Sequence, residues 1–226
     1  EIVRRAQDSG ADLLELNFGC PHGMSERGMG AAVGQVPEYT TLITSWVKEV
    51  ATIPVIVKLT PNVTDVAHMA WAARQGGGDA VSLVNTFNSI VGVDLDTLAP
   101  RPNVGRHGSH GGYCGPSVKP IALHMVSAVA SDPDIRVPVS GIGGVQAWQD
   151  AVEFLLLGAG SVQVCTAVMH YGFRIVERLI GPLDSPSLSG YRVFPAFDCL
   201  TYRRGTNPFA LELCVDQRST YMRFVA

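Results

Sequence analysis

The feature of this sequence that most constrains its fold is a repeated order of short apolar run, loop and helical pattern. Five runs are rich in apolar and β-branched residues and are bounded by glycine and proline, which is typical of strands buried on both faces. The predicted strands are residues 12–17, 55–59, 80–85, 137–140 and 161–165. Repeated βα units predict an α/β fold around a parallel sheet, either doubly wound or closed into a barrel.

Helical patterns fill the segments between these runs. Pro37 stands near the start of one helix and Gly158 just after another, as is common at helix ends. The predicted helices are residues 2–8, 37–51, 64–76, 116–130, 146–157 and 170–180. Five βα units are visible where a (β/α)8 barrel needs eight in about 250 residues, and the chain opens inside a helix. If the sheet is a barrel, we expect residues 1–180 to be its C-terminal part, with about three units missing.

Residues 181–226 do not continue this pattern. They hold Pro182, Pro186, Pro195 and Pro208, together with two cysteines, and show no clear periodicity. We interpret them as an unassigned, poorly ordered tail. A shifted reading frame or a misjoined exon is the favoured explanation, and a small appended element is the alternative.

Composition excludes several classes of protein. The 226 residues are 46% hydrophobic and 16% charged, which is a globular balance rather than a disordered one. Seventeen basic against 20 acidic residues give a net charge of −3, so a general electrostatic grip on nucleic acid or anionic lipid is not expected. No apolar run is long enough for a membrane span, and no signal peptide is expected at the start. Five cysteines without a CxxC pair predict a reducing, cytoplasmic setting.

Polar residues and glycines gather where the predicted strands end. Successive strands end at or near Asn17, Lys58, Asn85–Thr86, Gly143–Gly144 and Cys165–Thr166. Ligands bind at this edge of the sheet in both candidate architectures. We therefore predict that a binding site is built from these positions. At any single position, the alternative is a polar loop residue whose hydrogen bonds are made within the protein.

The last two of these positions resemble the phosphate cup of a barrel. A glycine-rich turn, residues 141–144, follows the fourth strand, and Cys165–Thr166 follow the next strand. Backbone N–H groups at such turns can point at a phosphate without obstruction by side chains. The alternative is that the glycines only turn the chain.

Lys58 and Cys20 are the candidates for chemistry. Lys58 is the one charged residue in its predicted strand, and burial of a lone ammonium is costly. A bound anion or electron-rich cofactor would compensate it, and an ion pair with Glu15 is the alternative. Cys20 begins a glycine-rich loop that we interpret as a mobile lid. Its thiol, protonated at neutral pH, could donate a proton, although a structural cysteine is the commoner fate.

Two further features carry weaker expectations. His107 and His110 lie close in sequence but have no third ligand nearby, so no metal site is predicted. The long segment between residues 87 and 115 is a candidate cover for the site. Cys114 and Cys165 are interpreted as structural residues or as backbone contacts.

Several long motifs resemble the dihydropyrimidine dehydrogenase family, over about residues 2–180. The version SGIGG at residues 140–144 is similar to that of the NAD-dependent bacterial type, in its FMN- and pyrimidine-binding catalytic subunit. The other stretches that carry the resemblance are ELNFGCPHGMSERGMG at 15–30, KLTPNVTD at 58–65, Asn85–Thr86, KPIAL at 119–123 and QVC at 163–165.

This resemblance implies an FMN-binding (β/α)8 TIM barrel that reduces uracil or thymine to the 5,6-dihydro form. In the family, reduced FMN gives hydride to C6 of the pyrimidine and a loop cysteine, here Cys20, protonates C5. Residues matching the substrate contacts are Asn17, Asn85 and Thr86. Residues matching the FMN contacts are Lys58, Gly115, Gly143, Gly144, Cys165 and Thr166, the last four around the phosphate.

The resemblance also implies partners. The complete enzyme would take electrons from NADH through an FAD/NAD-binding flavoprotein subunit and iron–sulfur clusters, and is expected to be an oligomer. The clustered cysteines that hold such clusters do not occur in this sequence. Two alternatives stay open: a dihydroorotate dehydrogenase, which shares the barrel and FMN, and a non-catalytic truncated chain. Orotate carries a carboxylate, so its site would need a compensating cation.

Overall fold

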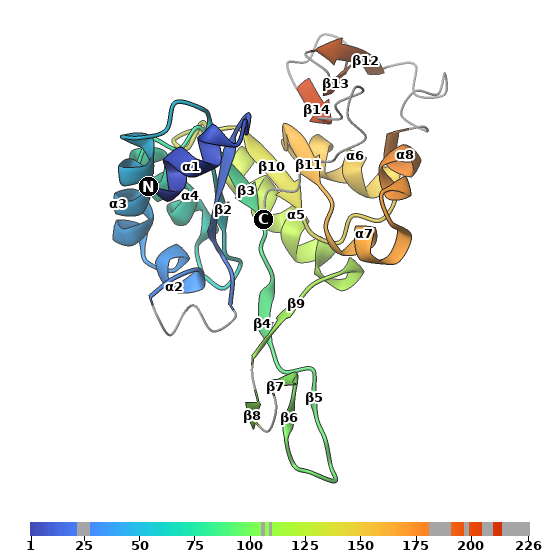
Figure 1. Cartoon of the computed structure of the whole chain (residues 1–226). Helices are drawn as coiled ribbons and strands as arrows, with labels where there is room; N and C mark the ends of the chain where they lie inside the picture. Colours follow the sequence, from blue (N-terminus) through green and yellow to red (C-terminus); the bar gives the residue numbers. More distant parts are fainter. Residues whose placement is uncertain are drawn as a thin grey trace. The chain divides into compact units, whose positions relative to one another are not determined.

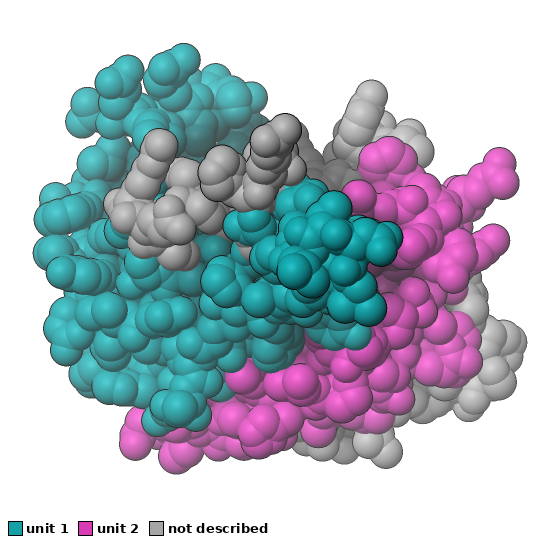
Figure 2. All heavy atoms as spheres, turned by 90° about the horizontal axis from the view of Figure 1, so that it is seen from below, with its two compact units in different colours: residues 1–114 teal, residues 115–226 magenta. Residues whose placement is uncertain are grey.

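The computed structural model describes residues 1–21, 28–104, 107–108 and 110–180, together with the backbone of three strands between residues 191 and 213. The chain divides into two compact units, residues 1–114 and residues 115–226, which are coloured separately in Figure 2. Parallel strands alternate with helices in both units, so the α/β class is confirmed. Closure of the strands into a partial barrel stays a prediction.

Unit 1 is built on three parallel strands in the order β1-β2-β3. Asn17 of β1 pairs with Lys58 of β2, and Lys58 pairs with Ser82 of β3. The elements of this unit up to β3 are α1 (Ile2–Asp8), β1 (Leu14–Phe18), α2 (Ala31–Gly34), α3 (Pro37–Lys48), β2 (Val55–Leu59), α4 (Val66–Gln75) and β3 (Ala80–Leu83).

Local sequence accounts for several of these boundaries. Pro37 begins α3, where its missing N–H costs no hydrogen bond. The Asp65 side chain accepts the N–H of His68 at 3.0 Å and so caps α4. Strand β2 is fully buried at alternate residues and only partly buried between them, at Ile56 and Lys58. Burial on both faces, as the sequence predicted, therefore does not hold for β2, because one of its faces carries the polar residues described below.

The segment predicted as a loop between residues 87 and 115 is an arm of short antiparallel ladders (Figure 1). Its apolar side chains include the largely exposed Val91, Leu95 and Leu98. Such two- and three-residue strands leave no periodicity in a sequence, because pairing across the arm defines them. The paired strands are β4 (Phe87–Ser89) with β9 (Gly111–Tyr113), β5 (Gly92–Val93) with β6 (Pro100–Arg101), and β7 (Asn103–Val104) with β8 (His107–Gly108).

Unit 2 has two parallel strands, β10 and β11, and a core centred on the fully buried Phe154. A Cβ at Gly141 of β10 would stand 2.6 Å from the Phe154 ring, so only glycine fits there. The elements of this unit are a 3-10 turn η2 (Pro116–Val118), α5 (Lys119–Ala130), β10 (Val139–Ile142), α6 (Trp148–Leu156), β11 (Ser161–Gln163), α7 (Thr166–Tyr171) and α8 (Arg174–Ile180), followed by β12 (Tyr191–Ala196), β13 (Cys199–Arg204) and β14 (Ala210–Leu213).

Two predictions for unit 2 were wrong in detail. The single helix predicted for residues 170–180 is two helices, because Gly172 adopts a positive φ of 63° and ends α7. The strand predicted for residues 137–140 is β10, two residues later, since Pro138 has no N–H to donate to a neighbouring strand.

Part of the C-terminal segment forms an antiparallel sheet in the order β12-β13-β14. The rest of residues 181–226, and the side chains of these strands, lie outside the described residues. The interpretation of this segment as an unassigned, poorly ordered tail therefore stays a prediction. Within the described ranges, every helix is too short or too polar to cross a bilayer.

Candidate functional site

The strand register of unit 1 brings polar side chains from three strands to one face of the sheet. Asn17, Lys58 and Ser82 are direct neighbours across β1, β2 and β3, and neighbours in register point to the same face. Glu15 lies two residues before Asn17 on β1 and therefore shares that face. The strand register alone thus brings a carboxylate, an ammonium, an amide and a hydroxyl group to one face of the sheet.

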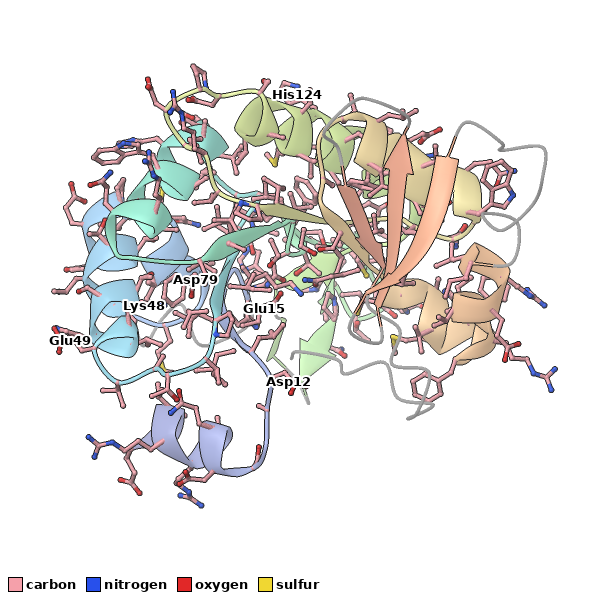
Figure 3. The ribbon with its side chains drawn as sticks, turned by 90° about the horizontal axis from the view of Figure 1, so that it is seen from above. Asp12, Glu15, Lys48, Glu49, Asp79 and His124 are labelled. Carbon is pink, nitrogen blue, oxygen red and sulfur yellow. The ribbon has the colours of Figure 1, made fainter. Side chains whose placement is uncertain are left out.

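Glu15 and Lys58 form a buried ion pair on this face. The Lys58 Nζ lies 3.2 Å from Oε1 of Glu15, whose side chain is 1% exposed against 15% for Lys58. The Ser82 hydroxyl donates to the other carboxylate oxygen, Oε2, at 2.9 Å. Figure 3 labels Glu15 on β1. Of the two alternatives that the sequence left open for Lys58, the ion pair is therefore present, and the lysine is not a lone buried charge.

The predicted substrate residues Asn17, Asn85 and Thr86 lie together. Asn85 Nδ2 donates to Asn17 Oδ1 at 2.8 Å, and the N–H of Gly19 donates to the same oxygen at 3.2 Å. The N–H of Thr86 donates to Asn85 Oδ1 at 2.8 Å. A Cβ at Gly19 would stand 2.4 Å from Cβ of Asn85, so glycine at position 19 makes this close pairing possible.

The sequence predicted that Asn85 and Thr86 end the third strand. In the structure they follow β3, which ends at Leu83. Asn62, to which the sequence assigned no role, holds them in place. Its Nδ2 donates to the Thr86 carbonyl at 3.1 Å, and its Oδ1 accepts the N–H of Asn88 at 2.9 Å. The signal available in the sequence was its position, three residues beyond the end of β2.

The Thr86 hydroxyl is buried and has no hydrogen-bond partner in the described part of the chain. A buried hydroxyl without a partner costs about 1–3 kcal/mol. A ligand that offers a donor or an acceptor beside Asn85 would remove this cost. These residues therefore offer amide groups and one unpartnered hydroxyl to a small polar molecule.

Cys20 is half-buried and lies two residues beyond the end of β1. Its carbonyl accepts the N–H of Ala31 at 3.0 Å, and a Cβ at Gly30 would stand 2.6 Å from that carbonyl oxygen. The backbone at Gly30 and Ala31 therefore packs against Cys20. Residues 22–27 lie outside the described residues, so the mobile lid stays a prediction.

Unit 2 brings together most of the residues matched to an FMN phosphate. Gly115, Gly143 and Gly144 have positive φ values of 95°, 140° and 75°. A Cβ at Gly144 would stand 2.9 Å from the carbonyl oxygen of Gly115, and one at Gly115 would stand 3.9 Å from Cγ2 of Thr166. Cys165 is the residue directly before α7 and is exposed. Two glycine turns thus meet beside Thr166.

A charged cluster that sequence reasoning missed adjoins Gly144 through Lys119. Lys119 Nζ is 2.6 Å from Oδ1 of Asp150 and 2.8 Å from Oε2 of Glu153. The hydrogen bonds that Lys119 donates to the carboxylates of Asp150 and Glu153 raise the pKa of Lys119. Burial alone would raise the pKa of Asp150, but Lys119 and two backbone N–H groups donate to its carboxylate and hold the pKa below its usual value.

Neither a metal centre nor a disulfide forms in the described part of the chain. No group of three His, Cys, Asp or Glu side chains there could hold a metal ion. Cys20, Cys114 and Cys165 are not joined by disulfides. The side chain of His107 lies outside the described residues.

Comparison with known proteins places the chain in a family. It belongs to the dihydroorotate dehydrogenase family, whose sequence model matches residues 1–185. It is 43% identical over 201 residues to the NAD-dependent dihydropyrimidine dehydrogenase subunit PreA of Escherichia coli (strain K12), covering 88% of this chain and 47% of that protein. It is also 43% identical over 187 residues to the chloroplastic dihydropyrimidine dehydrogenase (NADP(+)) of Arabidopsis thaliana, covering 81% of this chain and 44% of that protein.

The second enzyme type considered from the sequence is also found among the relatives. The catalytic subunit of dihydroorotate dehydrogenase B (NAD(+)) from Pyrococcus abyssi is 47% identical over 169 residues, covering 75% of this chain and 53% of that protein. The chain thus spans about half the length of the curated relatives it matches. The resemblance seen in the motifs is confirmed, and two pyrimidine-directed activities are represented among its relatives.

Proposed function

We propose that the protein is an FMN-dependent oxidoreductase that reduces uracil or thymine to the 5,6-dihydropyrimidine. The observation that carries this proposal is the Asn17–Asn85 amide pair beside the unpartnered hydroxyl of Thr86. Asparagine amides offer both a donor and an acceptor, which suits the alternating imide edge of a pyrimidine. The names of the relatives from Escherichia coli and Arabidopsis support this choice of substrate.

The charges in unit 1 favour a neutral pyrimidine over orotate. A site for orotate needs a cation to compensate the carboxylate of the substrate. Lys58 is the cation that the described residues place on the polar sheet face, and it is already paired with Glu15. Uracil and thymine carry no such carboxylate and require no second cation.

Each unit contains residues that we assign to FMN. When bound, FMN would supply the hydride for C6 of the pyrimidine. Lys58 matches the family's flavin-contacting lysine, and its ammonium has three N–H donors, so it could donate to the flavin while it stays paired with Glu15. The two glycine turns of unit 2 pack against each other so closely that a Cβ at Gly144 would stand 2.9 Å from the carbonyl oxygen of Gly115. The residues assigned to FMN are Lys58, Gly115, Gly143, Gly144, Cys165 and Thr166.

Cys20 would hold the proton that is transferred to C5. A cysteine thiol is one of the side chains that can act as a general acid. Hydride at C6 and this proton at C5 together complete the reduction of the 5,6 double bond. Asn17, Asn85 and Thr86 would hold the ring so that C5 faces the thiol.

Electron supply is the second part of the proposal. The Escherichia coli relative is named as an NAD-dependent subunit, which supports NADH as the electron source and a second subunit as the partner. We propose an FAD/NAD-binding flavoprotein partner, iron–sulfur clusters in the complete enzyme, an oligomeric assembly and a cytoplasmic location. Conversion of the pyrimidine itself can be tested without this partner.

A single-turnover experiment tests the conversion. The protein is loaded with FMN, reduced chemically without oxygen, and mixed with uracil, thymine or orotate while the flavin absorbance is followed. Uracil or thymine is expected to reoxidise the flavin with formation of the dihydropyrimidine, and orotate is expected to leave it reduced. Faster reoxidation by orotate would establish the dihydroorotate dehydrogenase alternative, which the Pyrococcus relative and the family model favour.

The role of Cys20 is tested in the same assay. Cys20→Ala is expected to slow reoxidation by uracil about 100-fold or more, because general acid catalysis contributes about that much. Cys114→Ala, at an exposed cysteine of the same unit, is the matched control and should not change the rate. An undiminished rate in Cys20→Ala would remove the proton-donor role. Failure of the unaltered protein to retain FMN would favour a non-catalytic chain.

A further inference from the structure

The carboxylate of Asp150 joins two segments of unit 2 that are far apart in sequence. Its Oδ2 accepts the N–H groups of Gln146 and Ala147, both at 2.8 Å. Its Oδ1 accepts Lys119 Nζ at 2.6 Å. One side chain therefore binds the turn that follows β10 and the first residue of α5 at the same time.

The backbone around Lys119 packs directly against the glycine turn. A Cβ at Gly144 would stand 2.8 Å from Cβ of Lys119, 3.1 Å from its backbone N and 2.9 Å from the carbonyl oxygen of Gly115. Any shift of Lys119 would change the space left for Gly144. The position of the glycine turn thus depends on where the ion pair with Asp150 places Lys119.

Lys119 itself is poorly suited to bind a phosphate. Its ammonium lies between two carboxylates, Asp150 at 2.6 Å and Glu153 at 2.8 Å, so the cluster has a net charge of −1 when all three groups are ionised. A dianion would gain little attraction from such a cluster. If these side chains affect phosphate binding, they do so through the backbone segments to which they are hydrogen-bonded.

We propose that Asp150 is a positioning residue that holds the Gly143–Gly144 turn in the shape that receives the phosphate group of FMN. It acts through its hydrogen bonds to the N–H groups of residues 146 and 147 and through Lys119. The inference rests on the proposed function, which assigns the glycine turns to that phosphate. It adds a residue that does not touch the cofactor to the determinants of cofactor selection.

Comparison of FMN with riboflavin, which lacks the phosphate, isolates this effect. Binding of each flavin to the whole chain is measured by the quenching of flavin fluorescence. For the unaltered protein, we expect tighter binding of FMN than of riboflavin. For Asp150→Ala, we expect the dissociation constant of FMN to rise about tenfold, as for the loss of one to two net hydrogen bonds, and that of riboflavin to change less than twofold.

Glu153→Gln is the matched control, because Glu153 contacts the same ammonium but not the turn. It should leave the ratio of the two dissociation constants within about twofold of the unaltered value. Asp150→Asn, which keeps one side-chain oxygen as an acceptor for the turn, should fall between the unaltered protein and Asp150→Ala. This milder variant also keeps the test valid if Asp150→Ala does not fold.

The outcomes separate this inference from the proposed function. If the unaltered protein prefers FMN and both Asp150 variants keep the full preference, Asp150 does not position the turn. If the variants weaken both flavins equally, Asp150 is a general structural residue and the inference is wrong. If the unaltered protein binds FMN and riboflavin equally, the assignment of the glycine turns to a phosphate is itself wrong.

Discussion

Removal of Lys58 should be among the most damaging single substitutions in unit 1. Lys58→Met removes the cation beside the Glu15 carboxylate, whose side chain is 1% exposed, while the Ser82 hydroxyl still donates to that carboxylate. Loss of one partner from a buried ion pair costs about 3–5 kcal/mol, because the other charge stays desolvated. The Lys58 side chain is 15% exposed, so water can reach its site, and the low end, about 3 kcal/mol, is expected.

Urea unfolding measures this loss. Unit 1 contains Trp46 and Trp71, whose fluorescence reports on that unit. Lys48→Met provides a control at an exposed ion pair with Asp79, in which the side chains are 28% and 43% exposed (Figure 3). It should cost less than about 1 kcal/mol.

A double variant completes the test. Glu15→Gln combined with Lys58→Met removes both charges and leaves an amide that can still accept from Ser82. Most of the stability lost in Lys58→Met should return, because the desolvated carboxylate is gone. If Lys58→Met costs no more than Lys48→Met, or if the double variant is less stable than Lys58→Met, the reasoning from a buried ion pair is refuted.

Three further predictions concern stability. Burial would raise the pKa of Asp79, but hydrogen bonds from Lys48 and the Val55 N–H hold that pKa below 3.8. The ionised Asp79 therefore stabilises the fold above pH 3.8, and this stabilisation is lost as the pH falls through the lowered pKa. Asp79→Asn should reduce the fall in urea midpoint between about pH 5 and pH 3; an unchanged fall would contradict this. Gly141→Ala should lower the free energy of unfolding by about 1–3 kcal/mol, because the new Cβ clashes with the Phe154 ring. In the double variant with Phe154→Leu, the total loss should be smaller than the sum of the two single losses, because the smaller side chain relieves the clash. Losses that simply add would contradict the clash. Phe154→Ala alone should cost about 3–5 kcal/mol in the same assay, and a loss below about 1 kcal/mol would show that Phe154 is not a core residue.

Strand β2 shows how far sequence reasoning reaches. Residues 55–59 were predicted as a strand, and β2 is Val55–Leu59. The bounds agree because a short β-branched run between two prolines favours a strand of that length. The second predicted helix, by contrast, ends three residues early, at Lys48, since helix ends depend on contacts beyond the local pattern. The arm between residues 87 and 113 was not predicted as strands at all, because its ladders exist only through pairing.

The candidate site divides in the same way. The sequence pointed to three of the candidate residues, because each ends or follows an apolar run and lies within a recognisable motif. These residues are Asn17, Cys20 and Lys58. Asn62 and Asp150 were missed as site residues, since neither departs from what is normal for a loop or a first helical turn. Each also has a hydrogen-bond partner that is remote in sequence: Thr86 lies 24 positions from Asn62, and Lys119 lies 31 positions from Asp150.

The sequence by itself determined the α/β class, the family and the side chains available for chemistry, because these depend on residue order and residue type alone. The tertiary structure decided how those side chains are used. Strand register made Lys58 the partner of Glu15 rather than a lone charge. Packing of Gly144 against Lys119 coupled a glycine turn to a carboxylate on another element. Both results depend on distances between segments that are remote in sequence, and no local pattern encodes such distances.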